Sequence, residues 1–169
     1  MLLQFLDWLL ISYHVKQSNC KSTLKIQASG EYENTYVFEF GDDNMNRIEL
    51  KEYIQNNYTT EPDYPWIKYP DYEVFRHSGN KKWFALIMGI PKNKLGLQGE
   101  SILEVANFKC DPVLMGSLLR ENGFFPAYHM SKTSWITVAL DGSVSDDKII
   151  MLLNMSFDAT APKIRKKQS

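Results

Sequence analysis

Apolar side chains change their spacing along the chain, and this change separates expected helices from expected strands. Between Ile48 and Ile54 the apolar residues fall near helical spacing. Asn46 followed three residues later by Glu49 is typical of a capping box, in which two side chains satisfy free backbone N–H groups at a helix start. We therefore expect a helix that begins after Asn46 and ends near Tyr58.

Period-two alternation and clusters of β-branched or aromatic residues predict the strands of the main domain. They are expected at 72–77, 83–88, 102–109 and 135–140, with a short extended piece at 124–128. The Ser-Gly-Asn-Lys sequence at 78–81 favours a hairpin turn between the first two strands. Three prolines in 59–70 exclude regular structure there, because each removes a backbone donor.

Two further helices follow from their end signals. Asp111 is placed to cap a helix whose first residue is Pro112, and Gly123 stands where a left-handed residue would end it. Ser145 is expected to cap a last helix with an apolar face at 149–153. The order of elements predicts an α+β domain, an antiparallel sheet with helices on one face.

The chain divides into three expected parts: an N-terminal extension at 1–44, the main domain at 45–160 and a basic tail at 161–169. The extension reads as an amphipathic helix at 1–11 plus a hairpin with strands at 24–28 and 35–40. The apolar run at 1–11 contains Asp7 and is too short to cross a bilayer, so we expect no membrane partner.

Composition limits the function more than it defines it. The 169 residues are 44% hydrophobic and 23% charged, which is typical of a globular protein. The two cysteines, Cys20 and Cys110, form no CxxC pair, so we expect a reducing cytoplasm and a packed Cys110 thiol. The net charge of −1 offers no global attraction for nucleic acid, so any nucleic-acid site must be a local basic patch.

No known catalytic signature is present, whether a nucleophile elbow, a phosphate-binding glycine loop or a zinc-protease motif. His14, His77 and His129 are too scattered to suggest a metal site. We therefore expect no enzyme, no catalytic residues, no metal and no cofactor. Asp111 is better explained as a helix cap than as an acid or base.

One loop concentrates chemically versatile side chains: Tyr128, His129, Lys132 and Trp135 lie within eight residues. Loops carry function more often than scaffolds do. The alternative is structural, with Trp135 packed on the core, His129 bonded to nearby backbone and Lys132 solvated. Other cations lie on the expected hairpin at 81–82, on the loop at 92–94 and at Arg120, beside aromatic residues.

A series of short motifs resembles the MmcQ/YjbR family over about residues 45–160. Their order matches the family, and the Lys-Cys-Asp-Pro block followed by Tyr-His-Met-x-Lys and Trp is specific in combination. The motifs lie at 64–66, 75–77, 80–85, 109–112, 126–132, 135 and 140–143.

The resemblance implies a frataxin-like (CyaY-like) α+β fold and a double-wing DNA-binding domain whose hairpins contact the duplex. The matching polar positions, and so the DNA-binding residues that the resemblance implies, are Lys82, Lys109, His129, Lys132 and Trp135. Iron binding, known in the fold's relatives, is disfavoured, because the first helix carries only Glu49 and Glu52 with Lys51 between them.

Three functions remain open from sequence. The first is a DNA-binding protein that contacts phosphates through hairpin and loop cations. The second is a protein-interaction or small-anion module with a pocket formed by Tyr128, His129, Lys132 and Trp135. The third is an enzyme with His129 as its only acid–base candidate.

Overall fold

The computed structural model describes residues 44–162. The expected helix at 1–11, the strands at 24–28 and 35–40 and most of the basic tail lie outside these residues. The described elements, in chain order, are α2 (Arg47–Tyr58), β1 (Glu73–Arg76), β2 (Trp83–Pro91), the 3-10 helix η1 (Lys92–Leu95), β3 (Ile102–Lys109), α3 (Pro112–Leu118), β4 (Phe124–Pro126), β5 (Trp135–Ala139) and α4 (Asp146–Thr160).

The five described strands form one antiparallel sheet in the order β1-β2-β3-β5-β4. Because neighbouring strands alternate in direction, the β1–β2 turn, the end of β3 and the loop from β4 to β5 share one end of the sheet. The β2–β3 connection, which contains η1, lies at the opposite end. The predicted α+β class is confirmed, and the expected loop at 91–99 contains a short 3-10 helix.

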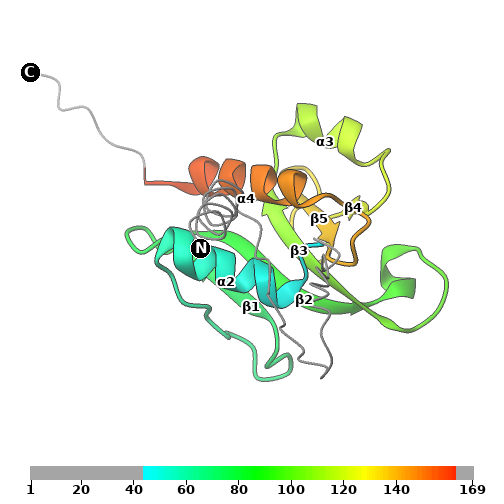
Figure 1. The fold of residues 1–169 in the computed structure, drawn as a ribbon, viewed down its shortest axis with the longest axis horizontal. Helices are drawn as coiled ribbons and strands as arrows, with labels where there is room; N and C mark the ends of the chain where they lie inside the picture. The colour runs from blue at the N-terminus through cyan, green and yellow to red at the C-terminus, as the bar shows by residue number, and fades with distance from the viewer. Residues whose placement is uncertain (1–43, 163–169) are drawn as a thin grey trace, which may run out of the picture. The chain divides into compact units, whose positions relative to one another are not determined.

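All three described α-helices contribute to the same core, on one face of the sheet. Leu50 and Ile54 of α2, with Ile149 and Leu152 of α4, are 0–1% exposed and belong to the cluster that contains Phe84. Figure 1 shows α2 and α4 running across the strands on the viewer's side of the sheet. The predicted placement of the helices on one face is therefore confirmed.

The second face of the sheet is also apolar, with Val74, Leu86, Met88 and Val105 at 0–2% exposure. Aromatic side chains pack against it from irregular segments as well as from strands: Trp66, Tyr72, Trp83, Phe125 and Tyr128. The Trp66 ring stands edge-on to Trp83 and to Tyr72, at centroid distances of 5.5 and 6.0 Å. The proline-rich segment 59–72 thus has a defined role as part of this second core.

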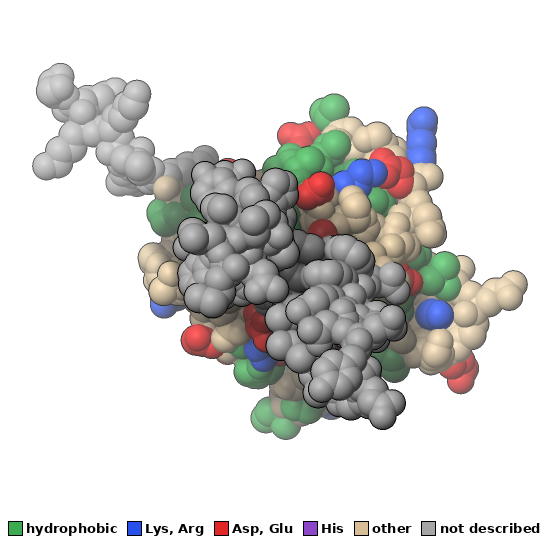
Figure 2. Space-filling view, in the orientation of Figure 1, with side chains coloured by type: hydrophobic (Ala, Val, Ile, Leu, Met, Phe, Trp, Pro, Cys, Tyr) green, Lys and Arg blue, Asp and Glu red, His purple; other side chains and the backbone are tan. Residues whose placement is uncertain are grey.

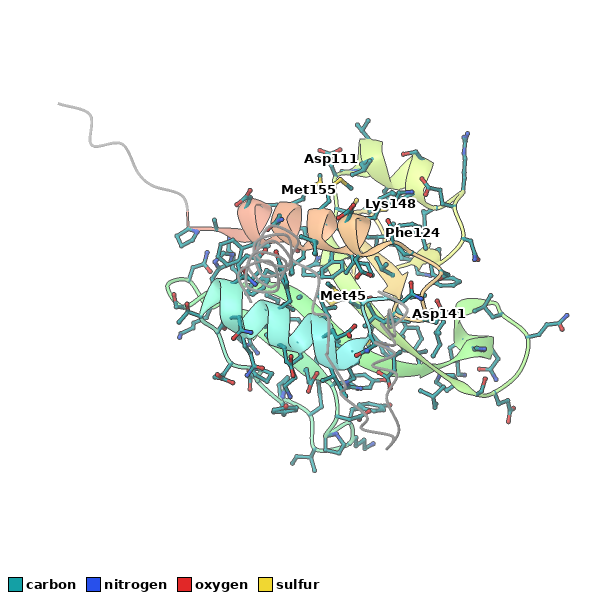
Figure 3. All side chains as sticks on the ribbon, viewed as in Figure 1. Met45, Asp111, Phe124, Asp141, Lys148 and Met155 are labelled. Atoms are coloured by element: carbon teal, nitrogen blue, oxygen red, sulfur yellow. The ribbon has the colours of Figure 1, made fainter. Side chains whose placement is uncertain are left out.

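The start of α2 follows the predicted capping box. The Asn46 carboxamide oxygen accepts the N–H groups of Ile48 and Glu49, and the Glu49 carboxylate accepts the Asn46 N–H at 3.1 Å. Met45, labelled in Figure 3 just before α2, donates its N–H to Asp146 Oδ1 at 2.6 Å. This bond ties the residue just before the N-cap of α2 to the first turn of α4.

One predicted helix end is wrong, and one predicted cap is confirmed in position only. The helix that begins after Asp111 ends at Leu118, well before Gly123. Gly123 does take a left-handed φ of 83°, but at the entry to β4, where a Cβ would collide with Ser143 and Val144. Ser145 occupies the N-cap position of α4 without a side-chain capping bond, and its carbonyl oxygen accepts the Lys148 and Ile149 N–H groups instead.

Within residues 44–162, none of the helices has the length and apolar character that a membrane crossing requires.

Candidate nucleic-acid interface

The fold brings the five sequence-predicted site residues to one end of the sheet. Lys82 directly precedes β2, Lys109 is the last residue of β3, and Trp135 is the first residue of β5. His129 and Lys132 lie in the loop that joins β4 to β5. We call these five residues the sheet-end group.

Direct contacts confirm that the sheet-end segments are neighbours. Lys109 and Trp135 are register partners in adjacent strands. The next residue, Cys110, donates its N–H to the Ser134 carbonyl at 3.0 Å. At the hairpin, His77 donates its N–H to the Lys82 carbonyl at 2.9 Å, which closes the turn beside β2.

Members of the sheet-end group differ in accessibility. Lys82, His129 and Lys132 are exposed and Lys109 is half-buried. Trp135 is 8% exposed and therefore serves mainly as a packed residue. None of the ion pairs found among residues 44–162 involves the three lysines, so their ammonium groups are available to an anionic partner.

A buried polar network fixes the loop that carries His129 and Lys132. The Thr137 hydroxyl donates to Asn107 Oδ1 at 2.6 Å and accepts the Tyr128 N–H at 3.0 Å. Asn107 Nδ2 in turn donates to the Tyr128 carbonyl at 2.8 Å. Both backbone groups of Tyr128 are thereby held by side chains that are 0% exposed, so the loop starts from a rigid point.

His129, the next residue, adopts a left-handed φ of 57°, which is uncommon for a residue other than glycine. Its ring packs on Tyr128 at a centroid distance of 4.0 Å. In the described part of the chain, its imidazole forms no hydrogen bond with another ionisable side chain. Within the same residues, the imidazole also lacks the hydrogen bond to nearby backbone that the structural alternative expected. It forms no hydrogen bond with a serine, threonine or cysteine side chain that could act as a nucleophile.

The β1–β2 hairpin is fastened to α4. His77 Nε2 lies 2.8 Å from the Phe157 carbonyl and 2.9 Å from Thr160 Oγ1. Asn80 Nδ2 donates to the Thr160 carbonyl at 2.9 Å, while its Oδ1 accepts the Lys82 N–H. Lys82 is therefore presented from a fixed turn, because His77 and Asn80 of this turn are bonded to the last turn of α4.

The lysines at positions 92 and 94 are separated from the sheet-end group. They belong to η1, which follows β2, whereas Lys82 precedes β2. A nine-residue strand spans about 30 Å at roughly 3.3 Å per residue. The two sets of cations therefore cannot act as one compact patch.

Charges of both signs are mixed on the face shown in Figure 2, where blue and red side chains lie close to one another. This mixture agrees with the net charge of −1. It favours a local electrostatic site over a protein-wide positive field.

A second charged cluster was missed by sequence reasoning. Glu73 is 6% exposed and lies against α2, where Lys51 Nζ is 2.8 Å from Oε1 and Arg47 Nε is 3.4 Å from Oε2. The hydrogen bond to Glu73 raises the pKa of Lys51. Arg47 also pairs with Glu104 at 2.8 Å. In the sequence Glu73 lies at the start of a predicted strand, and the residues next to it do not indicate that its side chain is buried.

Asp111 and Cys110 behave as expected. Asp111, at the start of α3 in Figure 3, accepts the Val113 N–H through its carboxylate at 2.8 Å. Cys110 is 4% exposed, and burial raises the pKa of its thiol. The predicted cap and the predicted packed cysteine are both confirmed.

One cavity among residues 44–162 has a volume of about 560 Å³, and the sheet-end loop does not line it. Tyr128, His129, Lys132 and Trp135 are all absent from its walls. The anion pocket that the sequence suggested at these four residues stays a hypothesis, because this cavity is formed by other residues.

Comparisons with known proteins match the same part of the chain. The YjbR family model matches residues 56–159. The uncharacterized protein YyaQ of Bacillus subtilis is 38% identical over 116 residues, which cover 69% of this chain and 98% of YyaQ.

Solved structures agree with the described fold. A crystal structure of a Pseudomonas syringae protein is 48% identical, with a TM-score of 0.68, and the match covers 69% of this chain and 100% of that one. A solution NMR structure from the same organism is 45% identical, with a TM-score of 0.67 and coverages of 74% and 100%. A crystal structure of a Deinococcus radiodurans protein is 20% identical, with a TM-score of 0.55, and the match covers 75% of this chain and 86% of that one. At this identity the likeness concerns the fold only.

Proposed function

The chain belongs to the YjbR family, and from this premise we propose that it binds duplex DNA through the phosphate backbone. The observation that carries the proposal is the gathering of Lys82, Lys109 and Lys132 at one end of the sheet, without ion-pair partners among the described residues. Their segments are far apart in sequence, so only the fold places these cations together.

Phosphate contact suits these lysines for two reasons. An ammonium group that neutralises a phosphate releases condensed counterions, which drives binding without any reading of base sequence. The hairpin that presents Lys82 and the loop that presents Lys132 are both held by buried or helix-anchored hydrogen bonds. Cations on rigid supports lose less conformational freedom when they meet a ligand.

The mixed surface charge limits the expected strength of binding. A net charge of −1 provides no long-range attraction, so affinity depends on a few local contacts. We expect micromolar or weaker affinity near physiological salt and little sequence preference, as for other non-specific electrostatic binders. His129 is exposed beside the lysines and can contact sugar or groove edges.

The test is fluorescence anisotropy with random-sequence duplex DNA over a series of salt concentrations. The variant K82Q/K132Q removes two exposed cations from the sheet-end group, and K92Q/K94Q removes two from the opposite end of β2 as a matched control. Each phosphate contact contributes about 0.9 to the slope of log K against log salt, so K82Q/K132Q should lower the slope by about 2.

The control variant should retain the slope of the unmodified protein, although both variants change the net charge by the same amount. Equal losses from both variants would mean that binding follows net charge and not the sheet-end group. Absence of binding at low salt, where electrostatic attraction is strongest, would refute the proposed function.

A further inference from the structure

A cavity of about 560 Å³ lies between the start of the proline-rich segment and the β1–β2 hairpin. Two segments line it, which we call its two walls: the first includes Thr59, Glu61 and Asp63, and the second includes Arg76, Ser78 and Lys81. The volume is within the range of small-molecule sites in proteins. Lys81 belongs to this cavity, whereas its neighbour Lys82 does not.

Charges in the cavity are separated by wall. The first wall carries the carboxylates of Glu61 and Asp63, and the second carries the guanidinium of Arg76 and the ammonium of Lys81. Formal charges therefore cancel over the cavity, with one ion pair, between Arg76 and Asp63, joining the two walls and with Glu61 and Lys81 left on opposite walls. A ligand with one positive and one negative group complements this arrangement, whereas a simple anion or cation faces repulsion from one wall.

Several of these groups keep unused bonding capacity. Arg76 Nε lies 2.8 Å from Asp63 Oδ2, Nη1 donates to the Lys81 carbonyl at 3.4 Å, and the guanidinium lies 5.0 Å from the centroid of the Trp83 ring. These contacts fix the guanidinium and occupy two of its five donors. Gln55 Nε2 donates to Glu61 Oε2 at 2.5 Å and leaves the other oxygen free. Among the described residues, the Lys81 ammonium forms no ion pair.

The cavity walls are held in place by the backbone. The Thr60 hydroxyl donates to the Arg76 carbonyl at 3.1 Å, and Asp63 exchanges two backbone bonds with Val74, at 2.8 and 2.9 Å. Thr59 and Lys81, on opposite walls, have left-handed φ values of 49° and 58°. Such conformations cost free energy and persist only where the surrounding structure determines them.

We propose that this cavity binds a small zwitterion, of the chemical class of a free α-amino acid. The ligand carboxylate is bound by Lys81 and by the unused donors of Arg76, and its ammonium group by Glu61 and the second oxygen of Asp63. Because most of the lining side chains are exposed, the charge pairs are screened by water. The expected affinity is about millimolar.

The test uses the full chain, labelled with ¹⁵N, and follows amide shifts by NMR. The common α-amino acids are titrated singly to about 10 mM, roughly tenfold above a millimolar Kd. For each amino acid that shifts the amides of 59–63 and 76–81, the N-acetyl derivative and the α-amide are titrated under the same conditions. These derivatives remove the ammonium charge and the carboxylate charge, respectively.

Binding by the free amino acid, with at least a fivefold loss for both derivatives, is the expected result, since each loses one charge pair. Equal binding of the N-acetyl derivative would overturn the proposal in favour of a plain anion site. Absence of localised shifts with every amino acid would also overturn it.

Neighbouring lysines separate this proposal from DNA binding. K81Q should weaken amino-acid binding by about fivefold and K82Q should leave it unchanged, since only Lys81 lines the cavity. In the DNA assay, K82Q alone should lower the salt slope by about 0.9. Failure of DNA binding therefore leaves the amino-acid result interpretable. Equal effects of K81Q and K82Q on amino-acid affinity would refute this site.

Discussion

Replacement of Thr137 by valine tests the buried network that supports the sheet-end loop. Valine has nearly the same shape as threonine but lacks the hydroxyl that accepts the Tyr128 N–H and donates to Asn107 Oδ1. Thr137 and Asn107 are both 0% exposed, so water cannot replace the lost partners without a structural change. The substitution leaves the buried acceptor of Asn107 and the part-buried Tyr128 N–H donor without their partner.

The expected loss of stability follows from these two groups. An unsatisfied buried hydrogen-bonding group costs about 1–3 kcal/mol, and the part-buried Tyr128 N–H falls below the top of that range. Thr137→Val should therefore lower the free energy of unfolding by about 2–5 kcal/mol. Thr137→Ser keeps the hydroxyl and removes one methyl group, which should cost only about 1 kcal/mol. The network therefore predicts that serine, the smaller residue, is better tolerated than valine.

Urea unfolding followed by tryptophan fluorescence measures this order directly. Thr133→Val is a matched control on the same loop, since Thr133 is exposed and its hydroxyl bonds, within residues 44–162, only to Ser131. It should change stability by about 0.5 kcal/mol or less. If valine at position 137 is tolerated better than serine, packing and not hydrogen bonding governs the site, and the reasoning about the loop support is wrong.

Two further predictions concern aromatic residues. Trp135 is 8% exposed, so Trp135→Ala should lower the free energy of unfolding by about 3–5 kcal/mol, which urea unfolding measures. A loss under about 1 kcal/mol would show that the indole is a surface group. Burial raises the pKa of Tyr58 to about 12, whereas the pKa of tyrosine in the unfolded chain is about 10. The unfolded chain therefore loses the phenol proton first, so the free energy of unfolding should be constant below about pH 10 and should fall as the pH rises toward 12. Tyr58→Phe should reduce this alkaline loss, and an unchanged pH profile in that variant would contradict the assignment.

Elements with complete local signals could be predicted from sequence. The capping box at Asn46, the bounds of β3 and the helix start at Asp111 each depend on residues within a few positions of one another. Gly123 shows the limit of such signals. Its left-handed φ could be expected from the sequence. Whether the glycine ends a helix or leaves room for the Ser143 side chain depends on contacts with residues 20 positions away.

The buried network could be predicted only in part. Asn107 lies between Ala106 and Phe108 in a strand, and a buried asparagine requires partners. Its partners, however, are Thr137 and the Tyr128 backbone, which come from another strand and a loop. Period-two patterns assign residues to faces, but they do not give the strand order that brings β3 beside β5.

The same strand order decides which cations can cooperate. Lysines on the hairpin and on the β2–β3 loop are similar in sequence context, yet they lie at opposite ends of a nine-residue strand. Lys109 and Lys132 are separated by a helix and a strand, yet their segments meet because β5 pairs with β3 while β4 takes the sheet edge. A surface assembled in this way depends on the fold, so a peptide that contains only one of its segments should lack it.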